Sequence, residues 1–345
     1  MNQPETRTTQ LEQGWRPSRR ELLGAGAVTV LGGTLAAGLR HAARHEGGLR
    51  ADVFISKADS YSSDLVGAIA DGLREIGVTA ASIRGKKVLL KPNLVETARG
   101  EPHVNTHPAV IVAAVEVFRR LDAAEVFVAE GQGHRRDSQL VLDESGMNAA
   151  LLQSRTTFID LNHDDVAAVA SAGRWSTLGK LHLPRTLLSA DFIVSMPKLK
   201  THHWAGVTCA MKNLFGVMPG IVYGWPKNVL HYAGIPQSIL DINATVKPHL
   251  AIVDAVVGME GDGPIMGTPK PLGCLVVGTN LPAVDATCAR LMKLNPYGVE
   301  YLTAASGALG PIHEHNVYQR GETIASLASR FAIIDSPHLQ GIALS

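Results

Sequence analysis

The stretch MPKLKTHHWAGVTCAMKNLFGVMPG, from Met196 to Gly220, is the best candidate in the sequence for a ligand site. It directly follows an apolar run, 192–194, that reads as a buried strand. Lys198, Lys200 and Lys212 therefore come where the chain should turn out of a sheet. Open α/β folds collect their ligand-binding groups at this place, so the stretch predicts a ligand site at the edge of a sheet.

The chain around this stretch alternates short apolar runs with longer amphipathic segments. Strands are predicted at 88–90, 126–129, 158–161, 192–194, 250–253 and 275–277, and helices at 64–76, 108–121, 139–152, 236–245 and 283–294. The pattern is typical of βα units and predicts an α/β fold with a mostly parallel, Rossmann-like layered sheet and helices on both faces. We expect one α/β domain over 50–335, or two lobes with a boundary near 205–235. The Gly- and Pro-rich segment 216–234 is predicted to be a long functional loop.

Composition excludes several classes of protein. The 345 residues are 46% hydrophobic with a formal net charge of +1, which excludes a disordered or fibrous chain and argues against nucleic acid as a partner. Cys209, Cys274 and Cys288 form no C-x-x-C pair, so their spacing does not support an iron–sulfur cluster or a zinc knot. We expect all three to pack in the core as small apolar residues.

The N-terminus carries a targeting signal. Arg19 and Arg20 directly precede an uncharged apolar run, 22–39, which resembles a twin-arginine export signal. Residues 1–45 are therefore predicted to be a signal peptide read by the twin-arginine export machinery, with an uncleaved membrane anchor as the alternative. The protein is expected in the periplasm or cell envelope, in contact with a membrane only through this segment.

Ionisable and amide side chains follow four predicted strands. Lys91 and Asn93 end the first, Glu130 ends the second, the stretch with Lys198 ends the fourth, and Asp254 ends the fifth. Because the carboxyl ends of parallel strands share one edge of a sheet, we expect these groups to converge there.

The basic groups suit an anion. If the strand continues, Lys198, Lys200 and His202 point the same way and form a clamp for a carboxylate or phosphate. Thr208 is expected to cap a following helix that carries Lys212 and Asn213, whose apolar surroundings make an unpaired lysine costly.

The acidic groups have two alternative roles. Asp254 and Glu260 lie in a Gly-rich segment and are predicted either to hold a divalent metal, with Asn93 or Glu130 as further ligands, or to orient lysines. Asp285 lies in an apolar helix, where a buried carboxylate needs a partner, and we expect a lysine of the cluster to supply it.

Several phrases resemble the domain-of-unknown-function 362 family. They are KPNLV at 91–95, PKLKTH at 197–202, VTCAMKNLFG at 207–216, His231, IVDAVVGMEGDGP at 252–264 and AVDA at 283–286. The resemblance covers roughly 50–320 and implies little about activity, because the family's biochemistry is largely unassigned. Many members carry a ferredoxin-like segment with clustered cysteines, and this chain departs from that pattern.

Three functions follow as hypotheses. The first is an enzyme for a small anionic ligand, in which Lys198, Lys200 and Lys212 bind charge and His202 or His231 moves protons, with metal assistance left open. The second is an accessory protein that binds an anion or metal without turnover. The third is a redox partner of an exported oxidoreductase, which the missing cysteine cluster disfavours. No cofactor is predicted other than the divalent metal that the first two hypotheses leave open.

Overall fold

The computed structural model describes residues 46, 48–134 and 136–343. The predicted export signal therefore lies outside the described residues. These described residues form one compact unit. Within the described part of the chain, no helix combines the length and the apolar character needed to span a bilayer.

The core of this unit is a ten-stranded mixed sheet in the order β12-β1-β11-β10-β7-β2-β3-β4, with β8 paired to β10 and β9. Most neighbouring strands are parallel; only β11 and β9 run antiparallel to their neighbours. A separate hairpin consists of β5 and β6. The strands are β1 (Ala51–Lys57), β2 (Lys87–Pro92), β3 (Glu125–Glu130), β4 (Phe158–Asp160), β5 (Val166–Ala170), β6 (Lys180–Pro184), β7 (Phe192–Met196), β8 (Lys198–His202), β9 (Gly206–Thr208), β10 (Leu250–Glu260), β11 (Thr268–Gly278) and β12 (Val317–Gly321).

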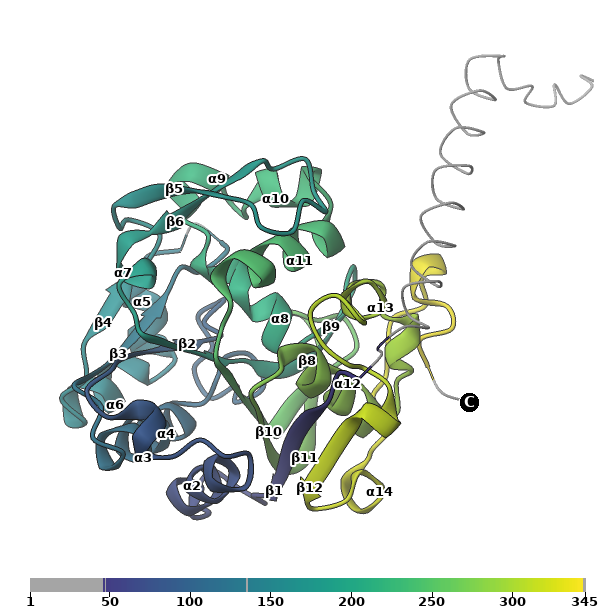
Figure 1. Ribbon diagram of the computed structural model, residues 1–345, viewed down its shortest axis with the longest axis horizontal. Coiled ribbons are helices and arrows are strands. Elements are labelled where there is room, and N and C mark those ends of the chain that lie inside the picture. Colours follow the sequence, from purple (N-terminus) through teal and green to yellow (C-terminus); the bar gives the residue numbers. More distant parts are fainter. Residues whose placement is uncertain (1–45, 47, 135, 344–345) are drawn as a thin grey trace, which may run out of the picture. The chain divides into compact units, whose positions relative to one another are not determined.

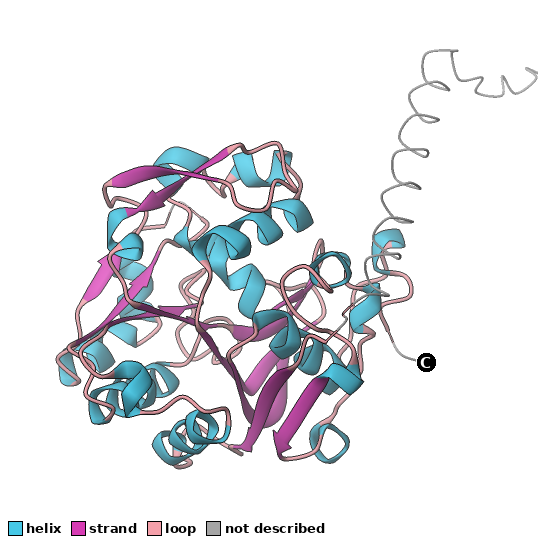
Figure 2. Cartoon of the chain, in the orientation of Figure 1, coloured by secondary structure: helices cyan, strands magenta, loops and turns pink. Residues whose placement is uncertain are grey.

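Helices pack on both faces of the sheet (Figures 1 and 2). One layer contains α2 and α4 with α6, and the other contains α8 and α12 with α11 and α13. The helices are α2 (Leu65–Glu75), α3 (Ala80–Ile83), α4 (Pro108–Arg120), α5 (Ser138–Glu144), α6 (Met147–Gln153), α7 (Arg185–Leu188), α8 (Ala210–Asn213), α9 (Gly220–Tyr223), α10 (Asn228–Tyr232), α11 (Ile235–Val246), α12 (Leu281–Leu291), α13 (Glu300–Ala305) and α14 (Ile324–Leu327), with single 3₁₀ turns at η1 (Leu214–Val217), η2 (Pro296–Gly298), η3 (Glu314–Asn316) and η4 (Pro337–Leu339).

Strand alternation separates the packing residues from the polar ones. Val88 and Leu90 of β2 belong to the hydrophobic core that α2 and α4 cover. Because successive strand residues point to opposite faces, Lys91 is directed to the other layer, where it meets α8. Ser195 of β7 does the same, and its hydroxyl donates to the carbonyl of Ala210 at 2.9 Å. The sheet thus carries polar side chains under α8.

The predicted α/β fold is confirmed, with two local corrections. The helix predicted at 139–152 is split into α5 and α6, because Gly146 has φ +74° and ends the first helix. The fifth predicted strand does not end at Asp254; β10 continues to Glu260 because it leaves β7 after Ala251 and then pairs with β8. The three cysteines are buried and free.

Candidate functional site

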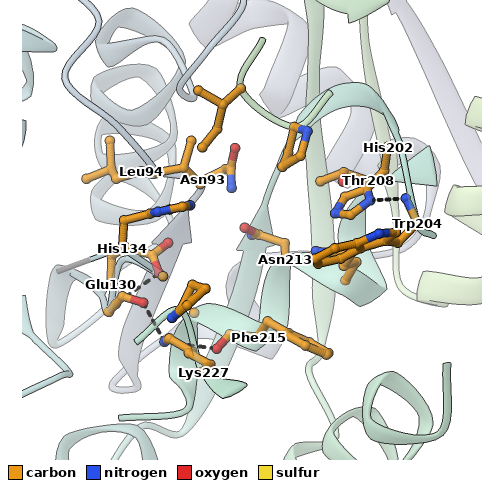
Figure 3. A pocket seen from close by; sticks show the side chains of 18 of the residues that line it. Asn93, Leu94, Glu130, His134, His202, Trp204, Thr208, Asn213, Phe215 and Lys227 are labelled. Carbon is orange, nitrogen blue, oxygen red and sulfur yellow. Dashed lines mark hydrogen bonds between the residues drawn. The ribbon is translucent and has the colours of Figure 1, made fainter. Parts of the chain in front are cut away.

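A cavity of about 360 Å³ lies where β2, β3, β8 and β10 end. Its lining comes from segments 91–95, 130–134, 202–216, 226–231 and 262–266. In Figure 3, His202 and Trp204 lie on one side of the cavity, and Leu94 and His134 lie on the other. Part of the expected convergence is present, because the ends of β2 and β3 meet the region around His202 and Lys212 here, whereas Lys198 and Asp254 do not line the cavity.

The floor of the cavity contains a buried ion pair. Nζ of Lys91 donates to the Glu130 carboxylate, to the Pro92 carbonyl at 2.8 Å and to Oδ1 of Asn213 at 3.0 Å. The Asn213 amide nitrogen donates in turn to the Lys91 carbonyl at 3.0 Å and to the Ser195 hydroxyl at 3.1 Å. Burial lowers the pKa of Lys91, and the Glu130 charge opposes that effect. This pair is satisfied within the protein, so it shapes the site more than it attracts a ligand.

Gly216 is required beside this pair. A Cβ at this position would overlap the Glu130 carboxylate and press on Nζ of Lys91. We expect Gly216→Ala to lower the free energy of unfolding by about 1–3 kcal/mol, because it overpacks a buried site. Gly133→Ala is the matched control, since Gly133 also lines the cavity but has no atom within 4 Å of the added methyl group. Equal urea-unfolding midpoints for the two variants would contradict this explanation.

Lys212 is one of three lysines in the cavity lining, with Lys91 and Lys227. It lines the cavity from α8, and within the described residues no hydrogen-bond acceptor or acidic side chain pairs with its ammonium group. Nζ lies 5.1 Å from the centre of the Phe215 ring. Burial, and then the charge of Lys91, lower the pKa of Lys212 to about 8. At neutral pH the group is thus mostly charged and is available to an anion.

Asp285 holds the short helix that carries Lys212. Its carboxylate accepts from the backbone N–H groups of Ala210 at 2.7 Å and Met211 at 3.1 Å, and from the Tyr301 hydroxyl at 3.0 Å. The prediction that a lysine pairs with Asp285 is therefore wrong, because the free amides of the helix start satisfy the carboxylate. Burial nevertheless raises its pKa to about 6.

The prediction that Thr208 caps this helix is also wrong. Cys209 is the N-cap residue and makes no side-chain cap, because Asp285 already occupies the N–H groups. The Thr208 hydroxyl is buried, lines the cavity and has no hydrogen-bond partner among the described residues. Oδ1 of Asn93, which also lines the cavity, is likewise unpartnered. Two residues of the cavity lining thus each hold a buried polar atom that has no hydrogen-bond partner among the described residues.

The hydrogen bonds of the two site histidines fix different roles. Nδ1 of His202 accepts from the backbone N–H groups of Trp204 at 3.0 Å and Ala205 at 3.2 Å, so a neutral His202 carries its proton on Nε2. Nδ1 of His231 lies 3.0 Å from the Lys227 carbonyl and donates to it, which leaves Nε2 as an acceptor. Burial lowers the pKa of both rings, most strongly for His202. His202 is therefore a hydrogen-bond donor, and His231 can accept a proton.

Lys198 and Asp254 form a second buried pair, outside the lining of the cavity. Nζ of Lys198 lies 2.6 Å from Oδ2 of Asp254. The Tyr61 hydroxyl accepts from Nζ of Lys198 at 2.8 Å and donates to Oδ1 of Asp254 at 3.1 Å. The backbone N–H of His107 donates to the Asp254 carboxylate at 2.9 Å, and the His107 ring stacks on Tyr61 at 3.7 Å between centroids. The structure thus gives Asp254 the role of orienting a lysine.

Lys200 and Glu260 do not line the cavity either. Nζ of Lys200 is buried and donates to the Pro264 carbonyl at 3.0 Å. Glu260 pairs with Lys270 at 3.5 Å and accepts from the N–H of Ala332 at 2.9 Å. No group of three or more His, Cys, Asp or Glu side chains in the described ranges is arranged to hold a metal ion. The metal role of Asp254 and Glu260 stays a prediction.

Lys227 is a buried residue of the cavity lining that the sequence did not single out. Its ammonium group donates to the carbonyls of Gly131 at 2.6 Å, Phe215 at 3.1 Å and Met218 at 2.5 Å. Burial lowers its pKa to about 7, and the charge of Glu130 opposes that effect. Lys227 thereby ties the segment 216–234 to the end of β3. The Gly- and Pro-rich composition of that segment predicted a loop, but it gave no indication that Lys227 would be buried in it.

Of the predicted site residues, the structure brings together Lys91, Asn93, Glu130, His202, Lys212, Asn213 and His231 around the cavity. The fold and these groups define an α/β protein with a cavity at the carboxyl ends of its strands that lysine and histidine side chains line. The sequence model of the protein family DUF362, a domain of unknown function, matches residues 88–290, which is more than half of the chain. The chain belongs to this family.

The chain is also similar to a thylakoid-associated protein of Synechocystis sp., with 25% identity over 264 residues, 73% of this chain and 78% of that protein. Among solved structures, the lactate racemase apoprotein from Thermoanaerobacterium thermosaccharolyticum matches with a TM-score of 0.41 at 14% identity, over 62% of this chain and 51% of that one. A Thermotoga maritima protein matches with a TM-score of 0.38 at 14% identity, over 65% and 58%. The chain thus spans about half the length of these two structures.

Proposed function

We propose that this chain is an enzyme that binds a small organic anion in the cavity and moves a proton to or from it. The observation that carries the proposal is the ammonium group of Lys212, which lines the cavity without an acidic partner among the described residues. An unpaired charge in such surroundings is costly, and an anionic ligand would remove that cost. A carboxylate and a phosphate group both fit this chemistry.

The other groups take roles around this anchor. Nε2–H of His202 and the Thr208 hydroxyl would donate to ligand oxygens, and Oδ1 of Asn93 would accept from a hydroxyl group of the ligand. Nε2 of His231 would accept the proton, because its Nδ1–H is held by a backbone carbonyl. Lys198 and Asp254 would act indirectly, by fixing the strand from which His202 projects. We further propose that the protein acts in the cell envelope, on the strength of the twin-arginine signal at residues 19–20.

Proton transfer can be detected without knowing the full reaction. With the protein in D₂O, His231 would remove a proton from the methyl group of pyruvate, which the neighbouring ketone acidifies, and solvent would supply the deuteron that replaces it, so we expect NMR to show deuterium entering this methyl group. His231→Gln should lower the exchange rate by about 100-fold or more and leave the affinity for the acid nearly unchanged, because a general base contributes about 10²–10⁴-fold. His163→Gln is the control, since this exposed histidine lies outside the cavity. Binding without any exchange would favour the accessory, non-catalytic alternative.

A further inference from the structure

One side of the cavity mouth is a wall of rings, which we call the aromatic wall: His203, Trp204, Phe215 and His231. Trp204 meets His203 edge-on at 4.7 Å and His231 at 5.5 Å, and His231 meets Phe215 at 6.2 Å. These edge contacts hold the Trp204 ring in place. Trp204 is nevertheless 56% exposed, so the aromatic wall contains a large ring that the rest of the protein does not cover.

The opposite side and rim of the cavity are also apolar. Leu94 faces the Trp204 side across the cavity in Figure 3. Val95, Ile265 and Met266 line the mouth as well, and Met266 is 78% exposed. Exposed apolar side chains gathered around one opening mark a surface that binds something apolar. The mouth therefore differs in character from the basic interior at Lys212.

The cavity is larger than the anion alone requires. Its volume of about 360 Å³ lies within the range of sites that enclose cofactor- or drug-sized ligands, about 300–1,000 Å³. A carboxylate or phosphate group at Lys212 would fill only part of it. The remaining volume lies beside rings and aliphatic side chains, so the rest of the ligand should be apolar and flat enough to lie on the aromatic wall.

We propose that the ligand is an anion that carries an aromatic ring, with its charged group at Lys212 and its ring on Trp204. The proposal rests on the proposed function and narrows its substrate class. A ring is favoured over a flexible alkyl chain because aromatic pairs gain energy beyond the area they bury. Trp204 is then the residue that sets specificity, and Lys212 is the residue that sets affinity for charge.

The test measures binding to the full chain by titration calorimetry for two head groups, carboxylate and phosphate. Each head group is tested as the bare anion (acetate or inorganic phosphate), with an alkyl chain, here called the hexyl form (hexanoate or hexyl phosphate), and with a benzene ring, here called the phenyl form (phenylacetate or phenyl phosphate). For the head group that the site prefers, we expect the phenyl form to bind about tenfold more tightly than the bare anion and about threefold more tightly than the hexyl form. Equal affinity for the phenyl and hexyl forms, or for the phenyl form and the bare anion, overturns the inference and leaves the proposed function standing. If none of the anions binds, the proposed function itself fails.

Variants of Trp204 complete the test. Trp204→Ala should remove the preference for the phenyl form and leave the affinity for the bare anion within about twofold, whereas Trp204→Phe should keep most of the preference. Tyr318→Ala is the matched control, because Tyr318 is an exposed aromatic residue outside the cavity. A preference that survives Trp204→Ala would show that the ring does not lie on the aromatic wall. Circular dichroism of each variant confirms that it folds.

Discussion

Lys212→Met should lower the affinity of the protein for small anions by roughly 10- to 100-fold. The substitution removes a charged donor from the cavity, and a hydrogen bond to a charged group contributes about 1.5–3 kcal/mol. Titration calorimetry with acetate or inorganic phosphate measures the change. Lys180→Met is the control, since Lys180 is exposed on β6 and does not line the cavity. If Lys212→Met and Lys180→Met bind the anion equally well, the site has been misassigned.

The same lysine predicts how affinity depends on pH. Its pKa is lowered to about 8, so the ammonium group is fully present about two pH units below that value and is lost as the pH rises through it. Affinity for acetate, whose own charge is constant above about pH 6, should therefore be highest below pH 8 and decline above it. Lys212→Met should abolish this decline. A decline centred near the ordinary lysine pKa would mean that another lysine holds the anion.

Asp254→Ala should be among the most destabilising single substitutions in the described part of the chain. The change leaves the ammonium group of Lys198, which is fully buried, without its counter-ion, and it removes the acceptor for the Tyr61 hydroxyl and the His107 N–H. Breaking a buried pair in this way costs about 3–5 kcal/mol. Urea unfolding followed by circular dichroism measures the loss, and failure to obtain soluble protein would agree with it.

Two comparisons separate the charge effect from simple loss of packing. Asp71→Ala, which breaks an exposed pair with Arg74, should change the free energy of unfolding by less than about 1 kcal/mol. The double variant Lys198→Met/Asp254→Leu should recover much of the stability, because both buried charges are removed together. If the double variant is as unstable as Asp254→Ala, the cost comes from lost packing and not from an unpaired charge.

The α/β fold could be predicted because its signals are local. The apolar runs of β2, β3, β7 and β10 appear directly in the sequence, and so do the amphipathic patterns of α2, α4 and α11. The short strands β5, β6, β9 and β12 were not predicted, and β8 was considered only as a possible continuation of the strand before it. β1 was not predicted either, although its residues alternate between buried and partly buried, as in a strand that is covered mainly on one face.

The candidate site could be predicted only in part. Strand ends identified Lys91, Glu130 and the β8 region, because parallel strands bring their carboxyl ends to one edge whatever the details of packing. The partner of each polar group depended on segments far away in sequence. Asp285, for example, binds amides 75 residues before it, and no local pattern indicates that pairing.

The α/β class, the sheet edge at which the cavity lies, and Lys212 as a basic residue in apolar surroundings all follow from the amino-acid sequence. Three pairings are visible only in the folded chain: Asp254 pairs with Lys198, Asp285 holds the helix of Lys212, and Lys227 is buried on three carbonyl groups. The physical reason is that burial patterns repeat along the chain within a few residues, whereas a buried charge takes whichever donor or acceptor the packing of distant segments places within about 3 Å of it.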